Sequence, residues 1–257
     1  MSMVYLRAFS FTDDSTNVAP LDNYPPLSST PMTPEKQLFL HQTDAAVHLT
    51  RLRRLQSCSY QELYQSSPQV LEQAWPVISK ALKSLHMWAF KMPNTIKEPI
   101  RRLIHSDLLY SNILVLSPPG LRGPLPEHGK ALIFDCATTF AELTSRVHED
   151  LAEFAFWTFH DLQRAAYVSS RFLDILEEDP NPLSNVVAPQ SLQDAEPITA
   201  LPNLRSERPE QMVNRAISCL DSLDKTLESF GTRFGELGPW EVHAARRSQI
   251  LPKLREH

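Results

Sequence analysis

Asp107, Asn112 and Asp135 are the residues whose types and spacing come closest to a catalytic set. Asp107 and Asn112 lie in the segment HSDLLYSN (105–112), and Asp135 follows the apolar triplet LIF. In phosphoryl transfer an aspartate can accept the proton of the attacking hydroxyl, while an asparagine and a second aspartate hold Mg²⁺. The three residues therefore raise the hypothesis of a phosphotransferase site.

This segment resembles the catalytic loop and metal-binding aspartate of protein kinases and aminoglycoside phosphotransferases. Those enzymes also need a glycine-rich strand–turn–strand over the phosphates and a strand lysine paired with a helix glutamate. The first glycine here is Gly120, and the first hundred residues have a helical pattern. Asp135 also falls on the polar side of an apolar helical repeat. We therefore interpret Asp107 and Asn112 as polar positions on a buried helix, and keep phosphotransfer as the alternative function.

No other set of reactive side chains indicates a catalytic or metal site. The 3 cysteines, Cys58, Cys136 and Cys219, are far apart, which argues against a disulfide framework and excludes a binuclear zinc cluster with its six thiolates. Cys136 and Cys219 lie on apolar faces and are predicted to be core residues. The 9 histidines lack ligand spacing, and no nucleophile has a base near it in sequence. We predict no catalytic, cofactor-binding or metal-ligating residue, and no enzyme activity.

The charge pattern does not favour a nucleic-acid-binding surface. The net charge is −5, and the one short arginine group is Arg51, Arg53 and Arg54, to which Arg7 and Lys36 could add. Arginines flanking leucines at helical spacing are more typical of a solvated helix face. We therefore expect no sequence-specific DNA binding by this chain alone, and interpret the tryptophans as core residues. They are Trp75, Trp88, Trp157 and Trp240.

Length and composition favour a helical protein with one sizeable core. The chain has 257 residues, of which 42% are hydrophobic, and it has neither a signal-peptide pattern nor an apolar run of the roughly 18 residues that cross a bilayer. We expect a soluble intracellular chain with no membrane contact. The 6 glycines are outnumbered by 21 prolines, and residues 1–119 contain no glycine. This absence indicates long helices joined by proline-bearing loops, because tight turns depend on glycine.

The apolar periodicity predicts an all-α fold. Residues 1–36, polar and proline-rich, are expected to form an extended arm, and residues 37–257 a helical domain with loop insertions at 117–129 and 179–209. We expect the segment 150–178 to form one long helix or two helices joined tightly. Pro76 is expected either to kink its helix or to restart it, and Gly231 to end the last helix. The predicted helices cover about 36–65, 67–93, 99–116, 133–144, 150–178 and 210–230.

Six short phrases occur in a fixed order along most of the chain and resemble one known family. Together they resemble the regulatory (middle homology) region of the fungal zinc-binuclear-cluster transcription factors, with Cys136-Ala137 matching a further cysteine–alanine helix. Phenylalanine stands at position 234 where that family has tryptophan. The phrases are RAFSFTDD (7–14), RLRRLQS (51–57), WAFKMP (88–93), LLYSNILVLSPP (108–119), FLDIL (172–176) and LESFGTRFG (227–235).

The resemblance implies an all-helical regulatory domain in the nucleus. It implies a transcription regulator, in a setting such as a secondary-metabolite gene cluster, that contacts the transcription machinery or a zinc-cluster partner and can respond to a small-molecule effector. The zinc cluster and its coiled coil are missing, so the chain would be a truncated or short member.

Overall fold

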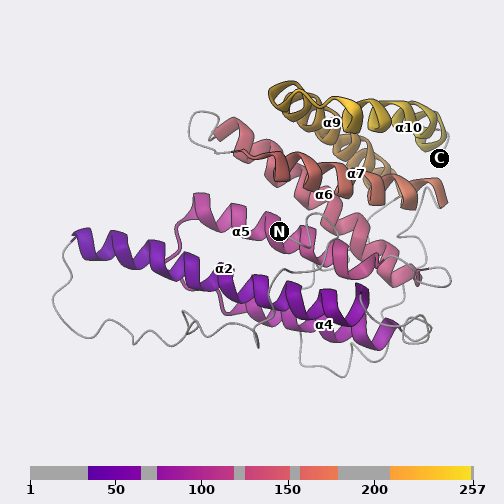
Figure 1. Ribbon diagram of the computed structural model, residues 1–257. Coiled ribbons are helices and arrows are strands. Elements are labelled where there is room, and N and C mark those ends of the chain that lie inside the picture. Colours follow the sequence, from indigo (N-terminus) through magenta and orange to yellow (C-terminus); the bar gives the residue numbers. More distant parts are fainter. Residues whose placement is uncertain (1–33, 65–73, 119–124, 151–156, 179–208, 256–257) are drawn as a thin grey trace. The chain divides into compact units, whose positions relative to one another are not determined.

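The computed structural model describes residues 34–64, 74–118, 125–150, 157–178 and 209–255, and every regular element in these ranges is a helix (Figure 1). The predicted all-α class is therefore confirmed for the described residues. The contacts divide the chain into two compact units, Met1–Leu108 and Leu109–His257. The boundary falls inside one helix. The helices are α2 (Pro34–Tyr64), α4 (Ala74–Phe90), α5 (Glu98–Leu116), α6 (Glu127–Asp150), α7 (Phe159–Glu178), α9 (Pro209–Phe234) and α10 (Gly238–Arg255).

In the first unit, α2 and α4 pack side by side in opposite directions. The indole Nε1 of Trp88 donates to the backbone oxygen of His48 at 2.9 Å, and the ring of His48 stacks on the indole with centroids 4.2 Å apart. Near the other end of the pair, the ammonium of Lys80 lies 3.0 Å from the carboxylate of Glu62. The apolar face predicted for this part of α4 is confirmed. Its buried members are Ala74, Ile78, Ala81, Leu82, Leu85 and Trp88.

In the second unit, α9 is the central helix, because it contacts α6, α7 and α10. Its apolar stripe is fully buried and comprises Ala216, Leu220, Leu223, Leu227 and Phe230. Ion pairs at the surface join α10 to α7. The guanidinium of Arg246 on α10 reaches Asp174 at 2.8 Å and Glu177 at 2.9 Å on α7.

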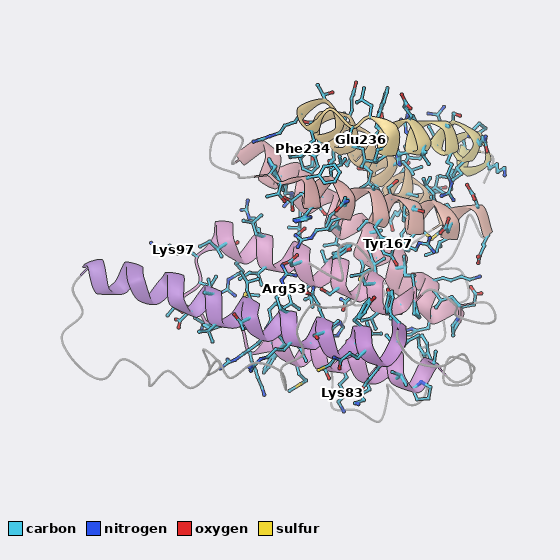
Figure 2. The ribbon with its side chains drawn as sticks, in the orientation of Figure 1. Arg53, Lys83, Lys97, Tyr167, Phe234 and Glu236 are labelled. Atoms are coloured by element: carbon cyan, nitrogen blue, oxygen red, sulfur yellow. The ribbon has the colours of Figure 1, made fainter. Side chains whose placement is uncertain are left out.

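The end of α9 differs from the prediction, because the helix runs through Gly231 to Phe234. Gly235 is the residue that ends it, with a φ of 70°. The backbone N–H of Glu236 then donates to the oxygen of Gly231 at 2.9 Å, which closes a Schellman motif (Phe234 and Glu236 are labelled in Figure 2). Gly231 is needed for a different reason: a Cβ there would lie 2.9 Å from the backbone oxygen of Glu236.

The start of α7 shows that 150–178 is not one continuous helix. Trp157 and Thr158 are non-helical, and α7 begins at Phe159. Both the backbone N–H and the hydroxyl of Thr158 donate to the carboxylate of Asp161 at 2.8 Å. This is a capping box, in which the third helical residue satisfies the N–H of the capping residue.

Two other boundaries also differ from the expected ones. α6 begins at Glu127, so the expected loop 117–129 is shorter at its C-terminal end; an acidic first turn favours that start. Pro76 is the third residue of α4 and therefore marks its beginning, where a missing N–H costs no hydrogen bond.

Most of the expected arm 1–36 and nearly all of the expected loop 179–209 lie outside the described residues, so the predicted domain boundaries stay a prediction. No helix in the described ranges is long and apolar enough to cross a membrane.

Candidate functional site

Asp107, the first of the phosphotransfer candidates, is a buried residue of α5 held by an arginine. Its Oδ2 accepts a hydrogen bond from Nη2 of Arg53 on α2 at 2.8 Å, and Nη1 of Arg53 donates to Gln56 at 2.7 Å (Arg53 is labelled in Figure 2). Arg53 was expected on a solvated face. Its side chain is 41% exposed, so it does reach solvent, and its guanidinium also neutralises a carboxylate that burial would otherwise destabilise.

Asn112 and Asp135 are also buried on helices of the second unit. The amide nitrogen of Asn112 on α5 lies 3.9 Å from the sulfur of Cys136 on α6. The expectation that Asp135 lies on the polar side of its helix is wrong: it is 5% exposed and forms an ion pair with Arg215 of α9. A charged residue can be buried here because an opposite charge meets it from a helix 80 residues away in sequence.

Cys136 and Cys219 are core residues, as predicted. Burial raises the pKa of the Cys136 thiol to about 12 and also raises that of Cys219. Both thiols therefore stay protonated at neutral pH and are poor nucleophiles and poor metal ligands. Within the described residues, no group of three or more histidine, cysteine or acidic side chains could hold a metal ion.

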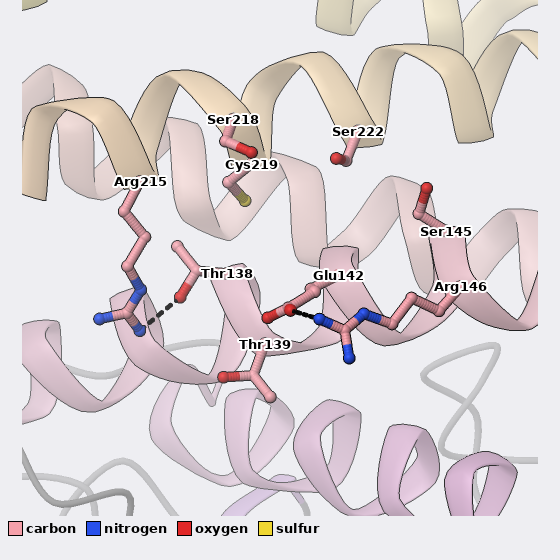
Figure 3. A pocket seen from close by; sticks show the side chains of 9 residues that line it. All are labelled: Thr138, Thr139, Glu142, Ser145, Arg146, Arg215, Ser218, Cys219 and Ser222. Atoms are coloured by element: carbon pink, nitrogen blue, oxygen red, sulfur yellow. Dashed lines mark hydrogen bonds and ion pairs between the residues drawn. The ribbon is translucent and has the colours of Figure 1, made fainter. Parts of the chain in front are cut away.

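A polar groove between α6 and α9 is the candidate functional site. Its volume is about 430 Å³, within the range of small-molecule sites. Figure 3 shows Arg215 opposite Thr138 and Ser222 opposite Ser145, so the two helices run in the same direction along it. Polar side chains make up almost the whole lining: Thr138, Thr139, Glu142, Ser145 and Arg146 from α6, and Arg215, Ser218, Cys219 and Ser222 from α9.

Arg215 is fixed at one end of the groove by contacts on several sides. Its Nη2 donates to Asp135 and, at 2.7 Å, to the hydroxyl of Thr138, and its guanidinium carbon lies 5.3 Å from the ring centroid of Phe134. Further along α6, Arg146 forms an ion pair with Glu142 one turn away (Figure 3). Each groove arginine is therefore matched by a carboxylate.

A buried serine–histidine pair joins α7 to α10 and was missed by the sequence analysis. The oxygen of Ser169 lies 2.6 Å from Nδ1 of His243, and Nε2 of His243 lies 3.2 Å from the backbone oxygen of Leu220. A carbonyl only accepts, so Nε2 carries the proton and Nδ1 accepts from Ser169. Sequence offers no signal for this pair, because its members are 74 residues apart.

This geometry resembles a nucleophile and its base, but both residues are almost completely buried: Ser169 is 3% and His243 1% exposed. The pocket beside them, with a volume of about 240 Å³, is lined by Ser169 and His243 themselves and otherwise mainly by apolar and small residues of α7 and α10. Burial lowers the pKa of His243, which keeps the ring neutral. We therefore assign the pair to the packing of α10 rather than to catalysis.

Comparisons with protein-family models, with curated proteins and with solved structures find no match to this chain.

Proposed function

We propose that this chain is a regulatory helical domain of the fungal zinc-cluster transcription-factor type, working in the nucleus through protein contacts or a bound small molecule. The observation that carries the proposal is the ordered series of six phrases. A further domain or partner would read the DNA, and a secondary-metabolite gene cluster is the proposed setting.

The positions of the phrases support this proposal, because they fall on framework positions of the helices. Trp88 of WAFKMP joins α4 to α2, and LESFGTRFG forms the glycine-dependent end of α9. All residues from Leu108 to Leu116 are buried, as are four of the five residues of FLDIL. These two phrases are therefore core segments, as a shared fold would require, whereas RLRRLQS, WAFKMP and LESFGTRFG consist mostly of exposed or half-buried residues. The phrase RAFSFTDD lies outside the described residues.

A reporter experiment tests the proposal. The full chain is fused to a heterologous DNA-binding domain in yeast, and reporter transcription is compared with that of the DNA-binding domain alone. We expect a several-fold change in either direction. The matched controls are Ser248→Ala, an exposed position on α10, and Leu220→Asp, which should abolish the effect by unfolding the second unit. Unchanged transcription at equal nuclear protein levels contradicts the proposal.

Phosphotransfer by Asp107, Asn112 and Asp135 remains the second candidate, favoured by the likeness of the segment HSDLLYSN to a kinase catalytic loop. Against it, the three residues lie on helices, and both aspartates already pair with arginines. We expect no thermal stabilisation by Mg²⁺–ATP. A micromolar site would stabilise the fold by about 4 kcal/mol at millimolar nucleotide. Stabilisation that Asp135→Asn abolishes would support phosphotransfer instead.

A further inference from the structure

Phe90, the last residue of α4, is the most exposed large apolar residue among those described, at 73%. Met87, one turn earlier, is 44% exposed. Both lie opposite the face that α4 buries against α2, so the packing of these two helices does not use them. Phe90 also makes no ring or cation–π contact with another described residue. A large aromatic side chain presented in this way is typical of the anchor of a protein interface.

The backbone around Phe90 is fixed, so its side chain projects from a rigid base. The N–H of Lys91 donates to the oxygen of Trp88 at 3.1 Å, and Trp88 is itself bonded to α2. After the turn, Nη2 of Arg101 donates to the backbone oxygen of Pro93 at 3.2 Å. A surface held in this way loses less conformational entropy on binding than a mobile segment does.

Two lysines give this face a positive charge. Lys83 and Lys91 stand four residues before and four after Met87, both are exposed, and neither forms an ion pair with a described residue (Lys83 is labelled in Figure 2). The helix α4 has no acidic residue. The described residues of the first unit include 10 basic and 5 acidic ones, although the whole chain has a net charge of −5. We call Lys83, Met87, Phe90 and Lys91 the basic knob.

The pocket between α7 and α10 in the second unit has the size and lining to receive a phenyl ring. Its volume is about 240 Å³. An apolar cavity of about 150 Å³ already holds benzene. Ser169 and His243 bond to each other, and the guanidinium of Arg246 is held by Asp174, so these polar lining groups already have partners. Val242, at the edge of the pocket, is 60% exposed. The pocket therefore suits an apolar side chain.

Two glutamates give the rim of this pocket a negative charge. Glu236 and Glu241 are exposed, and neither forms an ion pair within the described ranges (Glu236 is labelled in Figure 2). Oε1 of Glu236 lies beside Gly238, which lines the pocket, and Glu241 follows Gly238 by one helical turn. The nearby cation, Arg233, stacks over the ring of Phe234 at 5.8 Å from its centroid. We call the pocket and these two glutamates the acidic pocket.

We propose that copies of this chain associate by inserting Phe90 of one copy into the acidic pocket of the next. The lysines of the basic knob then face the glutamates of the rim, so the two surfaces match in both apolar character and charge. Because the two surfaces differ, each added copy keeps one knob and one pocket free, and association proceeds to chains or closed rings. This inference goes beyond the proposed function and does not depend on it.

The test is sedimentation equilibrium of the full chain. A contact that involves one aromatic anchor and a few charges is small, so we expect a monomer at about 10 µM and species larger than a dimer at about 1 mM. The association should weaken as salt is added, because the charged groups of the contact are exposed.

Two variants each remove one of the two surfaces. Phe90→Ser removes the anchor, and Val242→Lys places a cation at the edge of the pocket. Each variant alone should stay monomeric at about 1 mM, since neither can form the contact with itself. An equal mixture should form a one-to-one dimer and nothing larger, because only one productive contact is left. Both positions are exposed, so both variants should fold, which circular dichroism checks.

Charge reversal tests the electrostatic part of the contact. Lys83→Glu with Lys91→Glu should raise the dissociation constant about tenfold or more, because like charges would then meet. Adding Glu236→Lys with Glu241→Lys in the same chain restores opposite charges and should recover most of that loss.

The matched controls are exposed residues outside both surfaces. Leu103→Ser, at an apolar position that is 42% exposed, and Lys225→Glu, on α9, should leave the association unchanged. Three results would overturn the inference. The parent chain could stay monomeric throughout the concentration range. Association unaffected by Phe90→Ser or by Val242→Lys would place the contact elsewhere. A mixture of these two variants that stays monomeric would mean that the parent associates through one and the same face on both copies.

Discussion

Two buried histidines of the first unit are kept neutral by their surroundings. His48 on α2 stacks on Trp88, and its ring nitrogens have no hydrogen-bond partner among the described residues. Burial first, and then the charges of Arg51 and Arg101, lower the pKa of His48 to about 4. Burial alone lowers that of His86 on α4 to about 4. Protonating either ring would leave an unpaired charge in the core.

These histidines should make folding stability fall as the pH falls from 6.5 to 4. In the unfolded chain they titrate near 6.5, so below that pH the unfolded state binds more protons than the folded one. Above pH 6.5 both rings are neutral in either state and the free energy of unfolding is at its full value. As the pH falls to 4, the free energy of unfolding decreases by up to roughly 3 kcal/mol for each histidine. Urea denaturation across this range, followed by circular dichroism, measures the slope.

His86→Leu separates the histidine effect from that of carboxylates that protonate in the same range. Leucine has no proton to gain, so the variant should lose about half of the pH dependence that the two histidines supply. Equal slopes for the parent and His86→Leu would show that the pKa of His86 is the same in the folded and the unfolded chain, and that burial does not lower it.

The Ser169–His243 pair gives a second prediction at this scale. Ser169→Ala removes the donor to a buried ring nitrogen and should lower the free energy of unfolding by roughly 1–2 kcal/mol. Ser170→Ala, at the next and less buried position, is the matched control and should have little effect. Urea denaturation measures both. A serine-reactive phosphonate should not label Ser169 in the folded protein, and labelling there would reopen the question of catalysis.

At the scale of the element, the two glycines at the end of α9 should respond differently to alanine. Helix propensity alone predicts that Gly231→Ala stabilises by about 1 kcal/mol, because residue 231 is helical. We expect the opposite, a loss of about 2 kcal/mol, because the new Cβ would meet the backbone of Glu236. Gly235→Ala should cost about 1 kcal/mol from its positive φ alone, since space around it is open.

Gly238 is the control for this pair, since a Cβ there would meet only the carboxylate of Glu236, at 3.1 Å, which can move aside. Gly238→Ala should stay within about 0.5 kcal/mol of the parent. Thermal unfolding of the three variants ranks them. If Gly231→Ala proves more stable than the parent, close packing is not what requires glycine at this position.

Helices with a regular apolar stripe could be predicted from sequence, and α10 could not. Every described apolar residue assigned to the core face of α4 is buried. α10 contributes only His243, Ile250 and Leu254 to the core and contains Pro252, so its sequence has no apolar periodicity to detect. It is held by polar contacts from α7 and α9 instead. Those contacts join residues far apart in sequence, which no local pattern encodes.

The candidate site was less predictable for the same reason. Each wall of the groove is an unremarkable polar face of its own helix, and the site exists only where α6 and α9 meet. Asp135 was expected on the polar side of its helix, and its partner Arg215, which allows it to be buried, carried no signal in the sequence. Local periodicity places a residue on a face, whereas the charge that faces it depends on tertiary packing.

For the whole molecule, the charges limit what it can bind. The net charge is −5, and many basic side chains in the described ranges already pair with carboxylates of their own unit. Phosphate binding would have to displace these intramolecular partners. The paired residues include Arg53, Lys80, Lys130, Arg215, Arg246 and Arg247.

We therefore predict that the purified chain binds duplex DNA only weakly and without sequence preference. Affinity for DNA depends on the release of counterions by basic groups that neutralise phosphates, and a chain of net charge −5 that pairs many of its basic groups with its own carboxylates releases few. Fluorescence anisotropy with a labelled duplex should detect binding only at low salt, and it should vanish by physiological ionic strength. Arg51→Glu, at an exposed position of α2, tests whether the arginine group 51–54 supplies the weak binding that remains at low salt. Sequence-selective binding that survives physiological salt would mean that this chain reads DNA itself, and the proposed need for a separate DNA-binding domain would be wrong.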